Sequence, residues 1–125
     1  MVGMKGREEG FTLVEVLVAV MVLSVAFLAM FQMQAMAIRG NETGNQVTIA
    51  ATLAQDRMEQ VRNATYENVT AANFPNEDYG TIPDLPQFRR EVAITETGKM
   101  KSVRVTVLWR VVRTYRVVID TILTS

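Results

Sequence analysis

The sequence contains no cysteine and no histidine among its 125 residues. Without cysteine the chain cannot form a disulfide, and without either residue type the usual zinc ligands are missing. Histidine is also the commonest general acid or base and a member of the common catalytic triads. The sequence contains no Walker motif and no Gly-x-Ser-x-Gly elbow. These absences argue against an enzyme, and they give no reason to expect a metal or another cofactor.

Charged side chains are almost absent from one long stretch near the N-terminus. Between Val16 and Phe31 the only polar side chain is Ser24. A helix from Phe11 to Phe31 would be roughly 30 Å long, which is enough to cross the hydrocarbon core of a bilayer. Two basic residues precede it, Lys5 and Arg7. The pattern predicts one membrane-spanning helix with its N-terminus in the cytoplasm.

One carboxylate, Glu15, lies at the start of this apolar stretch. An ionisable group in a membrane segment is costly, so it is a functional-site hypothesis by default. A plain single-pass anchor gives Glu15 no role. A secretory signal cleaved near Ala35-Met36-Ala37 would have an apolar region of about 7–15 residues, shorter than this one. A buried helix of a soluble protein would need a larger core than 125 residues provide.

The run Gly10-Phe11-Thr12-Leu13-Val14-Glu15, between a short polar leader and an apolar helix, resembles the class III signal of type IV prepilins and type II secretion pseudopilins. The resemblance implies that a prepilin peptidase cleaves between Gly10 and Phe11 and methylates the new Phe11 amine. Because an unpaired carboxylate is costly in an apolar bundle, we predict that Glu15 is an assembly charge that pairs with the Phe11 amine of its own subunit or of a neighbour. Acidic residues stand before the junction, where many leaders of the family carry basic ones, namely Glu8 and Glu9.

The same resemblance divides the chain into three parts. It implies a cytoplasmic leader at residues 1–10, a transmembrane and assembly helix at 11–38, and a periplasmic pilin-like domain at 39–125. Within that domain, the glycines and asparagines of residues 40–46 predict a bend or a frayed turn, because each glycine costs a helix about 1 kcal/mol.

A second helix is predicted at residues 47–63, followed by a loop at 64–88 that contains all three prolines. Apolar side chains recur there at the i, i+3, i+4 and i+7 spacing of one helix face. They are Val47, Ala50, Ala51, Ala54, Met58 and Val61. The helix is therefore expected to cover one face of a sheet.

Three antiparallel strands are predicted at residues 90–96, 101–112 and 114–123, where apolar side chains alternate. Trp109 is expected on the face that packs on the helix, together with Val111. Three arginines are expected on the opposite face, Arg104, Arg110 and Arg116. The predicted fold is α+β and type IV pilin-like: a long N-terminal helix packed on a small antiparallel sheet of about three strands.

Charge is divided unevenly between the two parts of the predicted domain. Residues 39–87 carry a net charge of −4 and residues 88–125 a net charge of +5. A solvated surface, head-to-tail attraction between stacked subunits and DNA binding could each explain this division. Asp78 and Asp84 could also form a weak calcium site in the loop, although their spacing matches no EF-hand. Because the aromatic residues are assigned to the buried face, nucleic acid is not expected as a partner.

The segment Leu53–Arg62, Tyr66 and the predicted strands resemble PilV-type minor pilins and the I-type pseudopilins of type II secretion. This resemblance implies a structural subunit of a type IV pilus or of its priming tip complex. The alternatives are a type II secretion pseudopilin and an adhesive or DNA-binding tip subunit. The implied partners are the prepilin peptidase and N-methyltransferase, other pilins or pseudopilins, the inner-membrane assembly platform and membrane lipid.

Overall fold

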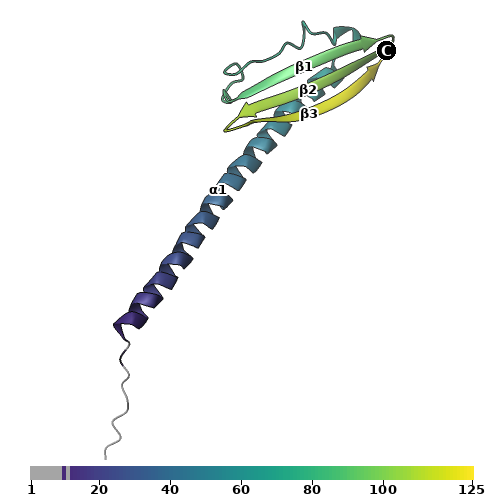
Figure 1. Ribbon diagram of the computed structural model, residues 1–125. Coiled ribbons are helices and arrows are strands. Elements are labelled where there is room, and N and C mark those ends of the chain that lie inside the picture. The colour runs from purple at the N-terminus through teal and green to yellow at the C-terminus, as the bar shows by residue number, and fades with distance from the viewer. Residues whose placement is uncertain (1–9, 11) are drawn as a thin grey trace, which may run out of the picture. The chain divides into compact units, whose positions relative to one another are not determined.

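The computed structural model describes residue 10 and residues 12–125. One long helix, α1, is followed by a short 3-10 helix, η1, and three strands (Figure 1). Their bounds are Leu13–Asn63 for α1, Tyr66–Asn68 for η1, Phe88–Thr97 for β1, Met100–Arg110 for β2 and Thr114–Thr124 for β3. The chain divides into two compact units, with the boundary between Glu42 and Thr43 inside α1.

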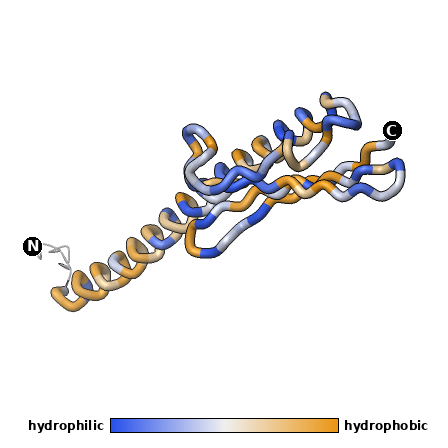
Figure 2. Tube along the Cα trace, turned by 90° about the horizontal axis from the view of Figure 1, so that it is seen from above, coloured by the Kyte–Doolittle hydropathy of each residue, from blue (hydrophilic) through white to orange (hydrophobic). Residues whose placement is uncertain are grey.

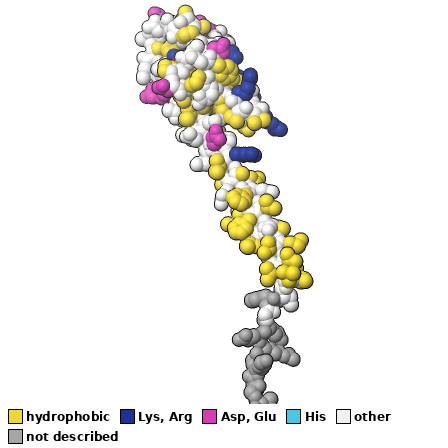
Figure 3. All heavy atoms as spheres, turned by 90° about the vertical axis from the view of Figure 1, so that its left-hand side faces the viewer, with side chains coloured by type: hydrophobic (Ala, Val, Ile, Leu, Met, Phe, Trp, Pro, Cys, Tyr) yellow, Lys and Arg dark blue, Asp and Glu magenta, His cyan; other side chains and the backbone are white. Residues whose placement is uncertain are grey.

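In the first unit, α1 from Leu13 to Glu42 has exposed side chains throughout. Hydrophobic residues dominate this half of the helix in Figure 2, and they cover its visible face in Figure 3. Ser24 donates its hydroxyl hydrogen to the Val20 carbonyl at 2.6 Å, so even this polar group is satisfied within the helix. Among the described residues, α1 is the one helix apolar and long enough to cross a membrane.

The expected frayed turn at residues 40–46 is wrong, because this segment is helical throughout. Thr48 donates its hydroxyl hydrogen to the Gly44 carbonyl at 3.0 Å, which adds a local bond beside the glycines. Helix propagation adds one hydrogen bond per residue, and long helical segments on both sides outweigh the cost of two glycines. An added Cβ at Gly40 or Gly44 would have nothing within 4 Å.

The second unit packs the last turns of α1 on an antiparallel sheet of order β1-β2-β3, which confirms the predicted α+β fold. Phe88 pairs with Trp109, and Trp109 pairs with Tyr115 across the sheet. The core consists of one face of α1, alternate strand residues and three loop residues, Val69, Phe74 and Ile82. Its largest fully buried members are Trp109, Phe88, Val61, Val69, Val103, Val105 and Val107.

Two details of the predicted packing need correction. On α1, Val47 was predicted to be buried but is exposed, and Leu53 is buried although it was not predicted to be. The buried face of the helix is therefore rotated slightly from the predicted face. On the sheet, β2 ends at Arg110, and Val111 is 57% exposed in the following turn. Alternation continues through Val111 in the sequence, but no strand pairs with it there.

The loop before β1 covers part of the β1 edge of the sheet. Beside β1, Asn76 accepts a hydrogen bond from the Val92 backbone N–H at 2.8 Å, and Glu77 forms an isolated bridge with Arg90. The loop therefore occupies part of that edge, which blunts it against pairing with another chain. The turn between β1 and β2 centres on Gly98, whose φ of 62° suits the first position of a type II′ hairpin turn.

A charged cluster joins the loop to both α1 and β1. Glu77 Oε2 accepts hydrogen bonds from Arg57 Nη2 at 2.6 Å and from Arg90 Nε at 2.5 Å. Arg90 is buried, and its Nη1 also donates to the Leu53 carbonyl of α1 at 3.1 Å. Partial burial tends to raise the pKa of Glu77, but the hydrogen bonds from Arg90 and Arg57 outweigh it and lower the pKa. The loop is thus held by a carboxylate that must stay ionised.

Replacing Glu77 with glutamine should destabilise the second unit by about 2–3 kcal/mol. This is somewhat below the range of about 3–5 kcal/mol for removing one partner of a buried ion pair, because Glu77 is 24% exposed. Unfolding of the fragment 39–125 in a denaturant titration measures the change in its free energy of unfolding. Glu91→Gln is the matched control, since its partner Arg89 is 38% exposed and the loss should stay below about 1 kcal/mol.

The same pair predicts a pH dependence. Since folding lowers the pKa of Glu77, its contribution is complete above the ordinary glutamate range near 4.3 and is lost as the pH falls below it. Glu77→Gln should lack this part of the acid destabilisation. Parallel acid profiles for the two proteins would show that folding does not lower the pKa of Glu77.

Candidate processing and assembly site

Gly10 lies before the start of α1, where its backbone is exposed and outside regular structure. A Cβ added to Gly10 would meet nothing within 4 Å. Within the described part of the chain, therefore, no packing requirement explains a glycine at this position. Phe11, the predicted site of cleavage and methylation, lies outside the described residues.

The start of α1 is closed by a reciprocal pair of hydrogen bonds between Thr12 and Glu15. The Glu15 backbone N–H donates to Thr12 Oγ1 at 3.2 Å, and the Thr12 backbone N–H donates to Glu15 Oε2 at 3.4 Å. This is a capping box, in which two otherwise unsatisfied donors at a helix N-terminus find side-chain acceptors. Glu15 also lies where the helix dipole favours negative charge.

The capping role of Glu15 was not among the expectations from the sequence, although its signal is local. A threonine followed three residues later by glutamate, before an apolar run, is the pattern of a capping box. The box holds an exposed carboxylate in the first turn, on the same side of α1 as an apolar strip. That strip consists of Val16, Ala19, Val20 and Leu23. Glu15 can thus cap its own helix and at the same time face a neighbouring surface that packs on this apolar strip.

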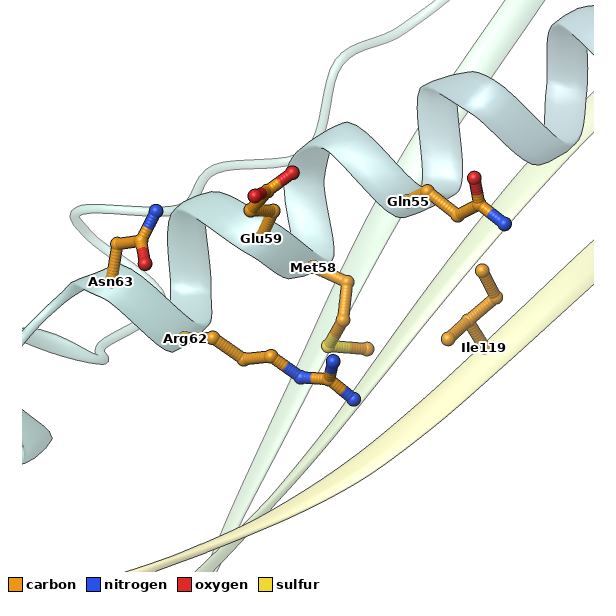
Figure 4. A pocket seen from close by; sticks show the side chains of 6 residues that line it. All are labelled: Gln55, Met58, Glu59, Arg62, Asn63 and Ile119. Carbon is orange, nitrogen blue, oxygen red and sulfur yellow. The ribbon is translucent and has the colours of Figure 1, made fainter.

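In the second unit, a hollow with a volume of about 580 Å³ lies between α1 and β3. Figure 4 shows the side chains of Met58 and Ile119 beside it, with polar side chains from α1 at its rim. The rim residues are Gln55, Glu59, Arg62 and Asn63. None of these lining side chains is a nucleophile with an adjacent base, the arrangement that covalent catalysis uses.

Of the two loop aspartates considered for a calcium site, Asp78 lies beside a basic side chain in the structure. Asp78 accepts a hydrogen bond from the Tyr79 backbone N–H and lies 3.5 Å from Arg89 Nε. Over the described residues, no group of three or more histidine, cysteine, aspartate or glutamate side chains is placed to hold a metal ion. Asp84 has a positive φ of 62°, which marks a turn.

The three predicted arginines lie on the sheet face opposite α1, but they do not form a continuous positive stripe. Arg104 pairs with Asp120 of β3, with Nε donating to Oδ1 at 2.7 Å. The guanidinium of Arg110 lies over the ring of Tyr79 at 6.0 Å. Trp109 is buried on the other face and stacks on Tyr115. The aromatic residues of β2 and β3, Trp109 and Tyr115, therefore lie on the face opposite these arginines, and Tyr79 of the loop contacts one of them.

Residues 5–31 match the family model described as the prokaryotic N-terminal methylation motif. The match contains Gly10, Phe11 and Glu15 together with most of the apolar half of α1. Comparison with curated proteins and with solved structures gave no match for the chain. The motif and the helix-on-sheet architecture are together consistent with a type IV pilin-like protein.

Proposed function

We propose that this type IV pilin-like chain is a minor structural subunit that is cleaved after Gly10, methylated at Phe11 and assembled into a type IV pilus or its priming tip complex. The observation that carries the proposal is a single carboxylate, Glu15, at the start of a helix whose next 27 residues, 16–42, are exposed. Such a surface must be covered by lipid or by other helices, because exposed apolar area of this size is unfavourable in water.

Cleavage would supply Glu15 with a partner. It creates a positive amine on Phe11, and this amine can pair with Glu15 of the same subunit or of a neighbour. In an apolar bundle of helices an unpaired carboxylate costs several kcal/mol. Pairing between neighbours would then favour one axial offset between subunits, so the charge would direct assembly.

Substitutions at Glu15 and Thr12 separate the assembly charge from the capping box. Glu15→Gln keeps a side-chain acceptor for the Thr12 N–H but removes the charge. It should still be inserted and cut after Gly10, yet its recovery in sheared filaments should fall at least about tenfold, the factor that corresponds to about 1.4 kcal/mol. Glu15→Leu should behave in the same way.

Thr12→Val is the matched control, because it removes one capping acceptor and leaves the charge in place. Loss of a cap costs about 1 kcal/mol at an exposed helix end, and the lipid-facing helix does not depend on it. Thr12→Val should therefore be recovered in filaments as well as the wild type. Full recovery of Glu15→Gln, or equal loss in all three variants, would contradict the assembly role of the charge.

A type II secretion pseudopilin remains the main alternative within the same family of structures. The match over residues 5–31 supports processing by a prepilin peptidase and assembly with other pilins for both functions. The experiment that distinguishes them is deletion of the gene: loss of surface filaments supports the pilus subunit, and loss of protein export with filaments intact supports the pseudopilin.

A further inference from the structure

The turn between β2 and β3 has a composition that its own fold does not explain. Val111 and Val112 occupy it and are 57% and 93% exposed. Turns favour glycine, asparagine, aspartate, serine and proline, whereas β-branched apolar residues suit half-buried strands. The opposite turn of the sheet follows the ordinary rule with Gly98-Lys99. We therefore expect these two apolar side chains to contact a surface outside this domain.

Basic side chains surround the two valines. Arg110 and Arg113 flank them directly, and Arg116 follows on β3, all three exposed. Within the described residues, Arg113 and Arg116 have no ion pair, while Arg110 contacts the ring of Tyr79. An apolar tip flanked by exposed arginines matches a lipid–water interface, where apolar groups enter the acyl boundary and guanidinium groups bind phosphates.

The contacts of α1 with the sheet show at which end of the second unit this tip lies. Lys101, at the start of β2, donates to the Tyr66 carbonyl, whereas Val107 pairs with Arg90, which donates to the Leu53 carbonyl. From Lys101 to Val107, β2 thus runs from η1, which follows the end of α1, back toward Leu53 within the helix. Because β2 continues in this direction to Arg110, the turn after it lies toward the end of the second unit that begins at Thr43.

Figure 1 shows the same arrangement within this unit, with the β2–β3 turn at the opposite end of the sheet from the C-terminus. The predicted membrane helix ends at Ile38, five residues before the start of the second unit at Thr43. The tip therefore lies at the end of the second unit from which the chain leads into the membrane segment.

We propose that the β2–β3 turn is a membrane-docking tip, in which Val111 and Val112 enter the lipid interface while Arg110 and Arg113 bind lipid phosphates. This contact would hold the second unit on the bilayer before assembly, and withdrawing a subunit from the membrane would have to break it. The proposal requires only that the apolar first half of α1 lies in a bilayer, so it does not depend on which assembly the chain enters.

The absence of cysteine allows a direct test with one label per chain. The full chain carrying Val112→Cys is labelled with an environment-sensitive fluorophore and reconstituted into vesicles, some containing lipids with a quencher at headgroup depth. Lys99→Cys, at the opposite turn, is the matched control. We expect blue-shifted emission and quenching by the lipid-borne quencher for the label at position 112, and neither effect for the label at position 99.

Charge substitutions provide the second measurement. In the Val112→Cys background, Arg113→Gln should weaken docking to vesicles that contain anionic lipid about fivefold, and Arg110→Gln should do the same. Equal access of both labels to aqueous iodide would overturn the proposal. Protection that appears only at high protein density, without quenching from the lipid, would assign the tip to a second subunit and would also overturn it.

Discussion

A chain carrying Gly10→Val should accumulate in the membrane as the uncut precursor. The processing peptidase must bring the backbone between residues 10 and 11 into its active site at the membrane surface, and a branched Cβ beside the scissile bond would obstruct this approach. A loss of only about 1.4 kcal/mol in transition-state fit lowers the rate tenfold, and a steric clash there should exceed that. Intact mass spectrometry of the membrane fraction identifies the N-terminus.

The surroundings of Gly10 in the structure allow this variant to test recognition by the peptidase and not the folding of the chain. Because an added Cβ at Gly10 would meet nothing within 4 Å, Gly10→Val should not disturb the chain itself. Gly6→Val provides the control, since it adds the same side chain to the leader away from the junction and should be cut normally. A mature N-terminus at Phe11 in the Gly10→Val chain would show that the cleavage site is elsewhere.

Replacing Trp109 with alanine should destabilise the second unit by about 3–5 kcal/mol. Trp109 is 2% exposed, and its ring lies 5.9 Å from Phe88 and 5.6 Å from Tyr115. Its removal leaves a cavity at the centre of an aromatic row. Small domains have a total stability of about 5–15 kcal/mol, so the loss is a large fraction. Denaturant titration of the fragment 39–125, which contains the whole core, measures it.

Two controls test the physical reason. The indole Nε1 of Trp109 is buried without a hydrogen-bond partner, so Trp109→Phe loses no bond and should cost about 1–2 kcal/mol, for the smaller ring alone. Val111→Ala should change stability by no more than about 0.5 kcal/mol, because Val111 lies beyond the end of β2. A near-zero effect of Trp109→Ala would show that the buried face of the sheet has been assigned wrongly.

The sequence alone determined the features that depend on neighbouring residues. An apolar run long enough to cross the hydrocarbon core predicts the first half of α1, and alternation about Trp109 predicts which sheet face is buried. Both patterns repeat within a few residues, so they do not require knowledge of distant contacts. The capping box of Thr12 and Glu15 belongs to the same class, since its signal lies within four residues.

Tertiary structure decided the features in which distant residues meet. Glu77 lies 20 residues from Arg57 and 13 from Arg90, and no local pattern predicts that one carboxylate joins both. The end of β2 was likewise decided by pairing, because strand geometry persists only where a partner supplies hydrogen bonds. Val111 and Val112 have strand-forming side chains, but they lie in a turn because β3 begins opposite Arg110. Local preference is worth tenths of a kcal/mol, whereas the ladder and the packed core fix the register of the whole sheet.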